Sequence, residues 1–123
     1  MKAPAPSETQ IQAAFFQAWR LFSPRNAIAF SVPNEAKRTK TEAARLKAQG
    51  LWPGCADVIV LVLGRAPLAL EFKSGVGRQT AEQKDFADAF RAVGGVYVVA
   101  RSEREALDVA RGHGAELPGE VGA

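Results

Sequence analysis

The sequence has few or no residues of several kinds, and each shortage excludes a structural feature or a function. Among its 123 residues there is one cysteine, so no disulfide can form within the chain; we expect Cys55 to fill a small apolar space and the protein to be cytoplasmic. No run approaches the ~18 apolar residues of a membrane span. The first residues, with Pro4 and Pro6, lack the apolar stretch of a signal peptide. The one histidine, His113, lies among glycines near the end of the sequence, where we expect it to be solvated rather than a catalytic base.

What is present fits one small domain. A chain of 123 residues, 47% hydrophobic and 24% charged, is ordinary for a single globular core. The net charge of +3 is unevenly spread, because residues 1–49 carry eight Lys and Arg against three acids and residues 79–123 carry five against eight. The basic side chains of the first part either follow the phosphates of a nucleic acid or form a solvated surface, and charge alone does not choose between these. They are Arg20, Arg25, Lys37, Arg38, Lys40, Arg45 and Lys47.

The most informative stretch, residues 50–73, predicts a loop followed by a β-hairpin. Val58 to Leu63 is apolar and rich in β-branched residues, as in a central strand covered on both faces. After a turn, Leu68 to Lys73 alternates, with Glu71 and Lys73 on the face opposite the large apolar side chains. Because hairpin strands are antiparallel, Asp57, which precedes the first strand, should lie near Glu71 and Lys73 and share their face.

Two carboxylates and an ammonium at one end of an apolar sheet suggest a metal-dependent reaction. Asp57 and Glu71 should repel unless a cation lies between them, and with the backbone oxygen of Phe72 they offer the hard oxygen ligands that Mg²⁺ or Mn²⁺ prefers. Lys73 would then hold a water in line with a phosphate, so the implied reaction is phosphodiester hydrolysis. The alternative is a solvated polar face, because an acid two residues before a lysine is common on strands.

Two further polar side chains fall on predicted apolar stripes of helices. Glu8 lies in a helix from Ser7 to Phe22, and it either reaches the metal site or complements the helix dipole at a solvated end. Gln83 lies in a helix capped by Thr80, and it orients a water or phosphate, closes a capping box with Thr80, or does both. The stripes consist of Ile11, Phe15, Trp19 and Phe22 in the first helix and of Phe86, Ala87, Phe90 and Val93 in the second.

The remaining segments complete an order of helix, strand, helix, strand, strand, helix, strand, helix. The strand that follows the helix of Gln83 should be parallel to the strand of Glu71. We therefore expect an α/β fold with a four-stranded mixed sheet flanked by helices. Residues 1–6 are expected to be a disordered leader, 7–112 the folded domain and 113–123 a flexible tail. The other predicted elements are strands from Ala27 to Val32 and from Val96 to Ala100 and helices from Thr41 to Gln49 and from Ser102 to Arg111.

Several short segments carry a resemblance to a known family. They are Ser7-Glu8, Pro33-Asn34-Glu35, Leu46-Lys47-Ala48-Gln49-Gly50, Pro53-Gly54, Asp57, Glu71-Phe72-Lys73, Gly77-Arg78, Gln83 and Val98-Val99-Ala100-Arg101-Ser102. In this order and spacing, over roughly Ser7 to Gly112, they resemble the VRR-NUC branch of the PD-(D/E)XK nucleases. The sequence departs from the family at Ala56, where a proline usually precedes the first acid.

The resemblance implies a restriction-endonuclease-like core (αβββαβ) and a DNA endonuclease of a bacterium or phage, selective for Holliday junctions or other branched DNA. The alternative is an inactive DNA-binding module with a nuclease fold. The implied catalytic residues are Asp57, Glu71, Lys73, Gln83 and Glu8, and the implied ligands of Mg²⁺ or Mn²⁺ are Asp57, Glu71, the Phe72 carbonyl and Glu8. The residues expected to bind DNA are Lys37, Arg38, Lys40, Arg45, Lys47 and Arg78.

We also expect a homodimer. Resolving a four-way junction takes two symmetric nicks, which two copies related by a two-fold axis would supply. Phe16, Trp19, Leu21 and Trp52 offer more apolar surface than one small core needs, so part of it is expected to lie in an interface. The alternative is that Trp19 and Trp52 pack together inside one copy.

Overall fold

A computed structural model describes residues 4–33 and 39–119 of the chain, and it has the predicted order of elements. Each predicted helix and strand is present, with its ends within one or two residues of those expected. In the described part of the chain, no helix is long and apolar enough to cross a membrane. The elements are α1 (Glu8–Phe22), β1 (Ala27–Ser31), α2 (Lys40–Ala48), β2 (Val58–Val62), β3 (Leu68–Phe72), α3 (Ala81–Ala92), β4 (Val96–Ala100) and α4 (Glu103–Gly112).

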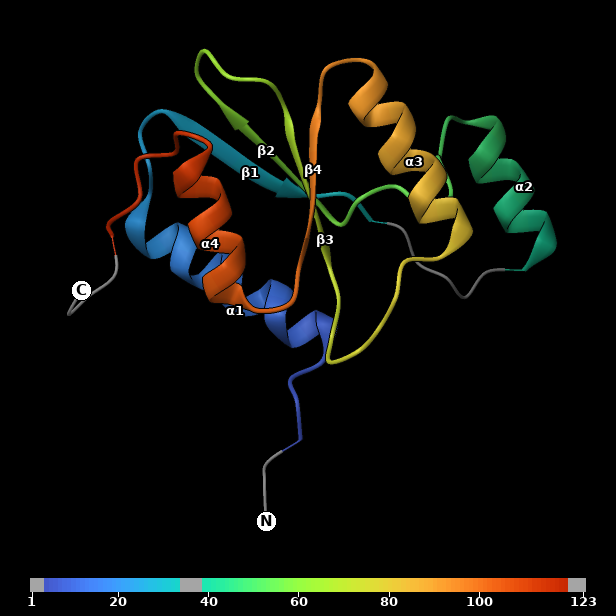
Figure 1. Ribbon diagram of the computed structural model, residues 1–123. Coiled ribbons are helices and arrows are strands. Elements are labelled where there is room, and N and C mark those ends of the chain that lie inside the picture. Colours follow the sequence, from blue (N-terminus) through green and yellow to red (C-terminus); the bar gives the residue numbers. More distant parts are fainter. Residues whose placement is uncertain (1–3, 34–38, 120–123) are drawn as a thin grey trace.

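The strands form one mixed sheet in the order β1-β2-β3-β4. Strand β2 is antiparallel to both β1 and β3, and β4 is parallel to β3, as predicted for strands joined through a helix. Helices α1 and α4 cover one face of the sheet, and α3 lies on the other with α2 on its outer side (Figure 1). The predicted four-stranded mixed α/β fold is therefore confirmed.

The larger core lies between the sheet and the pair α1 and α4. Its centre is Phe15 of α1 and Phe72 of β3, whose ring centroids are 5.8 Å apart. Ile11 and Trp19 complete the buried stripe of α1, as its helical spacing predicts. Two stripe residues were wrongly predicted: Phe22 is 42% exposed and Val93 is 86% exposed. Both lie where a helix stops, so the chain leaves the helical path before they reach the core.

The strand buried on both faces is β3 rather than β2, which corrects the expectation for Val58 to Leu63. All five residues of β3 are buried, whereas in β2 Leu61 is 41% exposed. The reason is that α3 contacts β4 and covers the β3–β4 half of its face, leaving the β1–β2 half open. Leu61 pairs there with Ile28 of the edge strand β1, which is 59% exposed.

Residues 113–123 were expected to form a flexible tail. This prediction is wrong for residues 113–117. Ala115 and Leu117 are buried in the larger core. The side chain of Asn26 holds this segment, since it donates to the Gly114 carbonyl and accepts from the backbone N–H of residue 116 at 2.9 Å each. His113 is half-buried and donates through Nε2 to the carbonyl of residue 66, so it is not the solvated side chain expected.

Candidate active site

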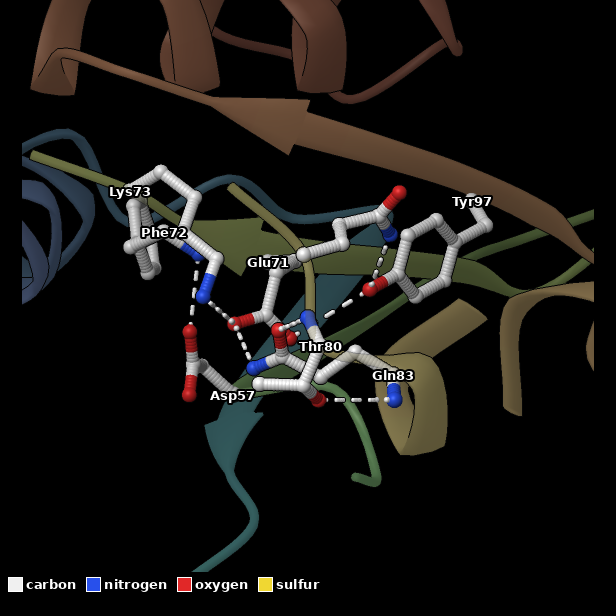
Figure 2. Close-up of polar contacts among 8 residues, drawn as sticks. Asp57, Glu71, Phe72, Lys73, Thr80, Gln83 and Tyr97 are labelled. Atoms are coloured by element: carbon white, nitrogen blue, oxygen red, sulfur yellow. Dashed lines mark hydrogen bonds and ion pairs between the residues drawn. The ribbon is translucent and has the colours of Figure 1, made fainter. Parts of the chain in front are cut away.

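The hairpin brings the two predicted acids to the same end of the sheet. Val58 pairs with Leu70, and continuing this register by one residue places Asp57 opposite Glu71. Opposite residues of an antiparallel pair share a face, so the predicted register is confirmed. The Asp57 carboxylate accepts a hydrogen bond of 2.7 Å through Oδ2 from the backbone N–H of Phe72, which ties the residue before β2 to the end of β3 (Figure 2).

The loop before Asp57 is fixed by close packing against α3. Gly54 has φ +81, and a Cβ at this position would lie 2.4 Å from the carbonyl carbon of Glu82. Only glycine permits this approach of two backbones. Ala56 is fully buried beside Phe86, and Cys55 packs against the same cluster, as expected of a small filler. Burial of Ala56 thus constrains the backbone next to Asp57.

Glu71 is the most enclosed acid of the site, with 1% of its surface exposed. Its Oε2 accepts a hydrogen bond of 2.9 Å from Gln83 Nε2 and lies 3.8 Å from Lys73 Nζ. Its Oε1 accepts from the Tyr97 hydroxyl at 3.3 Å. Figure 2 shows these side chains converging on the carboxyl group from β3, α3 and β4. Lys73 is also buried, with 6% exposed, so the acid and the ammonium are held together away from bulk water.

Gln83 closes a capping box and also contacts Glu71. Its backbone N–H and side-chain Oε1 form a capping box with Thr80, at 3.1 and 2.9 Å. The cap holds the amide oxygen, so the amide nitrogen Nε2 points at Glu71 and donates to it. The capping box is confirmed, and the contact with water or phosphate stays a prediction.

Tyr97 belongs to the site but was not found from the sequence. Its hydroxyl accepts a hydrogen bond of 3.1 Å from Gln79 while it donates to Glu71. The missed signal is a polar ring at an alternate position of the apolar strand Val96–Ala100, since the register Ala69 with Tyr97 puts the ring on the face of Glu71.

Burial shifts the pKa values of both acids upward, toward the protonated form. Burial above all, and then the charge of Asp57, raise the pKa of Glu71 to about 8, against the opposing effect of Lys73. Burial also raises the pKa of Asp57, and the charge of Glu8 adds to this. Burial and the charge of Glu71 raise the pKa of Tyr97 as well. A cation between Asp57 and Glu71 would lower the pKa of Glu71, so the two carboxylates fit a small divalent ion that prefers oxygen. The Phe72 carbonyl as a further ligand stays a prediction.

Glu8 lies beside this site without joining the acid pair. It is exposed in the first turn of α1, and a Cβ on Gly77 would lie 4.0 Å from its Oε2 and 3.7 Å from the Lys73 stem. Within the described residues, no three His, Cys, Asp or Glu side chains gather as a ligand set. Glu8 therefore contributes charge near Lys73 in this structure, and its role as a ligand stays a prediction.

Four of the predicted DNA-binding residues lie in the described part of the chain, on α2 and in the loop between β3 and α3. Lys37 and Arg38 lie outside the described residues. Lys40, Arg45 and Lys47 are exposed on α2, which buries none of its side chains and lies outside α3 (Figure 1). Arg78 is exposed in the loop between β3 and α3.

Fold and site together define a structural class. The chain has a restriction-endonuclease-like core, in which a hairpin of a mixed sheet carries an acid pair and a lysine at one end. No family model and no curated protein matches the sequence. Among solved structures, a "VRR_NUC domain protein" matches with 22% identity and a TM-score of 0.67, over 92% of this chain and 90% of that chain. The protein therefore has a VRR-NUC-like fold.

Proposed function

We propose that this protein is a metal-dependent DNA endonuclease that hydrolyses phosphodiester bonds and selects branched DNA such as Holliday junctions. The observation that carries the proposal is the enclosed carboxyl group of Glu71, which lies opposite Asp57 and 3.8 Å from Lys73. Burying two acids and an ammonium costs folding free energy, and such groups are typical of functional sites. The nuclease domain named in the similar structure supports the same conclusion.

The proposal gives each residue of the site a role. Asp57, Glu71 and the Phe72 carbonyl would hold Mg²⁺ or Mn²⁺, and when bound the ion supplies a water of lowered pKa and neutralises charge on the phosphate. Lys73 donates to the attacking water and directs it toward the phosphorus atom. Gln83 holds the Glu71 carboxyl in place, because its own amide is fixed by the cap of α3.

Cleavage of labelled linear, flapped and four-way DNA with Mg²⁺, Mn²⁺ or a chelator tests the proposal. We expect cleavage with either metal, none with chelator, and the fastest cleavage on branched substrates. Lys73→Met keeps the aliphatic stem and should abolish cleavage while DNA affinity changes little, because the ammonium acts on the nucleophile. The matched control is Lys84→Met on the exposed side of α3, which should cut normally. Binding without cleavage under every condition would instead establish the inactive DNA-binding module.

The exposed basic residues of α2 are proposed to grip DNA outside the site. Arg45→Ala combined with Lys47→Ala should weaken binding and lower the salt slope by about 0.9 for each lost phosphate contact. An unchanged slope would make α2 an ordinary solvated surface. Lys37, Arg38, Lys40 and Arg78 can be tested in the same way.

The homodimer stays a proposal, but the residues proposed to form its interface change. Trp19 is buried within one copy, and Trp52 packs against Phe86 rather than Trp19, with ring centroids 5.7 Å apart. The open half of the sheet, which includes the exposed side chains of Ile28 and Leu61, offers an apolar surface to a second copy. Light scattering at micromolar concentration should give a mass near twice the 13.1 kDa chain, and Ile28→Lys with Leu61→Lys should halve it. A monomer that nicks both strands of a junction would contradict this proposal.

A further inference from the structure

Helix α1 and the edge strand β1 enclose a groove of about 880 Å³ that opens beside Asp57. Its size is within the ~300–1,000 Å³ of ordinary ligand sites. The groove exists because Ala29 and Ser31, which face α1 from β1, are too small to fill the space under the helix. Since Asp57 lines the groove, a ligand bound there would lie next to a substrate at the candidate active site.

A flat charged platform forms part of the groove wall. Arg20 and Phe16 are four residues apart on α1 and so lie on one side of the helix. The guanidinium carbon of Arg20 lies over the Phe16 ring, 5.7 Å from its centroid. Unpaired bases stack on guanidinium planes as well as on aromatic rings, and the N–H edge of the same guanidinium can donate to a phosphate.

The other groove residues suit a sugar–phosphate chain. Thr9 and Gln12 of α1 and Ser31 of β1 line it with hydroxyl and amide groups. Among its described lining residues, Arg20 is the one basic side chain and Asp57 the one acidic side chain. An anionic ligand is therefore favoured at the Arg20 end, with its reacting group directed toward Asp57.

We propose that this groove binds an unpaired nucleotide next to the scissile phosphate, with its base stacked on the Arg20–Phe16 platform and its backbone along Thr9 and Gln12. The assignment rests on the proposed nuclease function, because it takes the acid pair as the cleavage site. A paired base fits poorly, since both of its faces are covered within the duplex stack and neither is free for the platform.

Trp19 lines the groove and serves as the reporter of binding. In a Trp52→Phe background it is the remaining tryptophan, and a chelator prevents cleavage during the titration. A single-stranded oligothymidylate should change its fluorescence in a saturable way. Loss of one base stack weakens binding roughly 5- to 150-fold, so Arg20→Gln and Phe16→Leu should each weaken it within that range. Arg25→Gln removes the same charge outside the groove and should leave the affinity unchanged.

An abasic deoxyribose-phosphate oligomer separates stacking from charge. It should bind as weakly to the parent as oligothymidylate binds to Phe16→Leu, provided circular dichroism shows that variant to be folded. Equal affinity of the two oligomers, or of the parent and Arg20→Gln, would overturn the groove assignment. If metal-dependent cleavage persists in that case, only this inference fails. If the groove binds as described but no metal supports cleavage, the proposed nuclease function fails instead.

Discussion

The two faces of the sheet differ in size and in chemistry. The face under α1 and α4 carries the larger core, built from aromatic and aliphatic side chains around Phe15 and Phe72. The face under α3 carries a smaller apolar cluster and, next to it, Glu71 and Lys73, the buried charged residues of the described chain. Stability and chemistry are thus placed on opposite sides of one layer of strands.

Strand β3 belongs to both faces. Its residues at even positions, such as Leu70 and Phe72, enter the larger core, whereas Glu71 and the following Lys73 point to the α3 side. The period of two in a strand makes this separation possible within a few residues. Substitutions in β3 should therefore fall into two sets, one that lowers stability and one that removes activity without lowering it.

The largest expected effect is on the apolar face. Phe72→Ala should lower the free energy of unfolding by about 3–5 kcal/mol, because it leaves a cavity against Phe15 in a fully buried site. Urea denaturation at pH 7 measures it. Phe22→Ala is the control, since this residue is 42% exposed at the end of α1, and it should cost less than half as much. Similar costs for the two would show that the larger core is not where the fold is stabilised.

On the α3 face, a substitution is expected to raise the free energy of unfolding rather than lower it. The pKa of Glu71 is raised from 4.5 to about 8, mainly by burial and then by the charge of Asp57. Between these values the folded state holds a proton that the unfolded state releases, so without divalent metal the free energy of unfolding should fall as pH rises through this window. Glu71→Gln cannot ionise, and we expect it to be about 2–3 kcal/mol more stable than the parent at pH 8, with a flatter pH profile.

The response of the parent and of Glu71→Gln to metal checks whether the ionised Glu71 carboxyl group lowers stability. Mg²⁺ or Mn²⁺ should restore stability to the parent at pH 8 and have little effect on Glu71→Gln, which should also fail to cut DNA. Urea denaturation across pH 4.5–8 measures both effects. A variant less stable than the parent at pH 8 would show that the ionised carboxyl group stabilises the fold, contrary to the comparison of the two faces.

A smaller effect is expected where the loop before Asp57 meets α3. Gly54→Ala combines an unfavourable positive φ with a contact of 2.4 Å to the Glu82 backbone, and it should cost about 1–2 kcal/mol or more. Gly50→Ala is a matched control, because Gly50 also has a positive φ, +103, but open space around it. Only Gly54→Ala should also slow cleavage, since it displaces Asp57. Equal activity of the two variants would mean that Asp57 is not positioned by this loop.

Much of the fold and part of the site could be predicted from local patterns. Apolar periodicity located the helices and strands, and antiparallel pairing brought Asp57 to Glu71. The pattern could not show which strand would be covered on both faces, because the reach of α3 decides this. Nor could it show that Leu117 returns to the core, since one leucine among prolines and glycines has no periodicity.

Tyr97 was missed because its role depends on a contact between distant segments. Its hydroxyl meets Glu71 only through the parallel pairing of β3 and β4, and it meets Gln79 only through the loop before α3. Periodicity marks the residue as buried but does not name its partner. The groove beside Arg20 was missed for a similar reason, since small residues on β1 become a cavity only under a helix.

The smallest predicted effect tests whether Tyr97 positions Glu71. Tyr97→Phe keeps the ring in its cluster but removes the hydroxyl that donates to Glu71 at 3.3 Å. A lost outer hydrogen bond typically lowers metal affinity by about tenfold or more, so calorimetry should show weaker Mn²⁺ binding by about that factor, while stability changes by only about 1 kcal/mol. Phe86→Leu, in the same cluster, should lower stability and leave Mn²⁺ affinity unchanged. If the two variants change metal affinity equally, Tyr97 only packs on this face, and the division between the faces is less sharp than the contacts indicate.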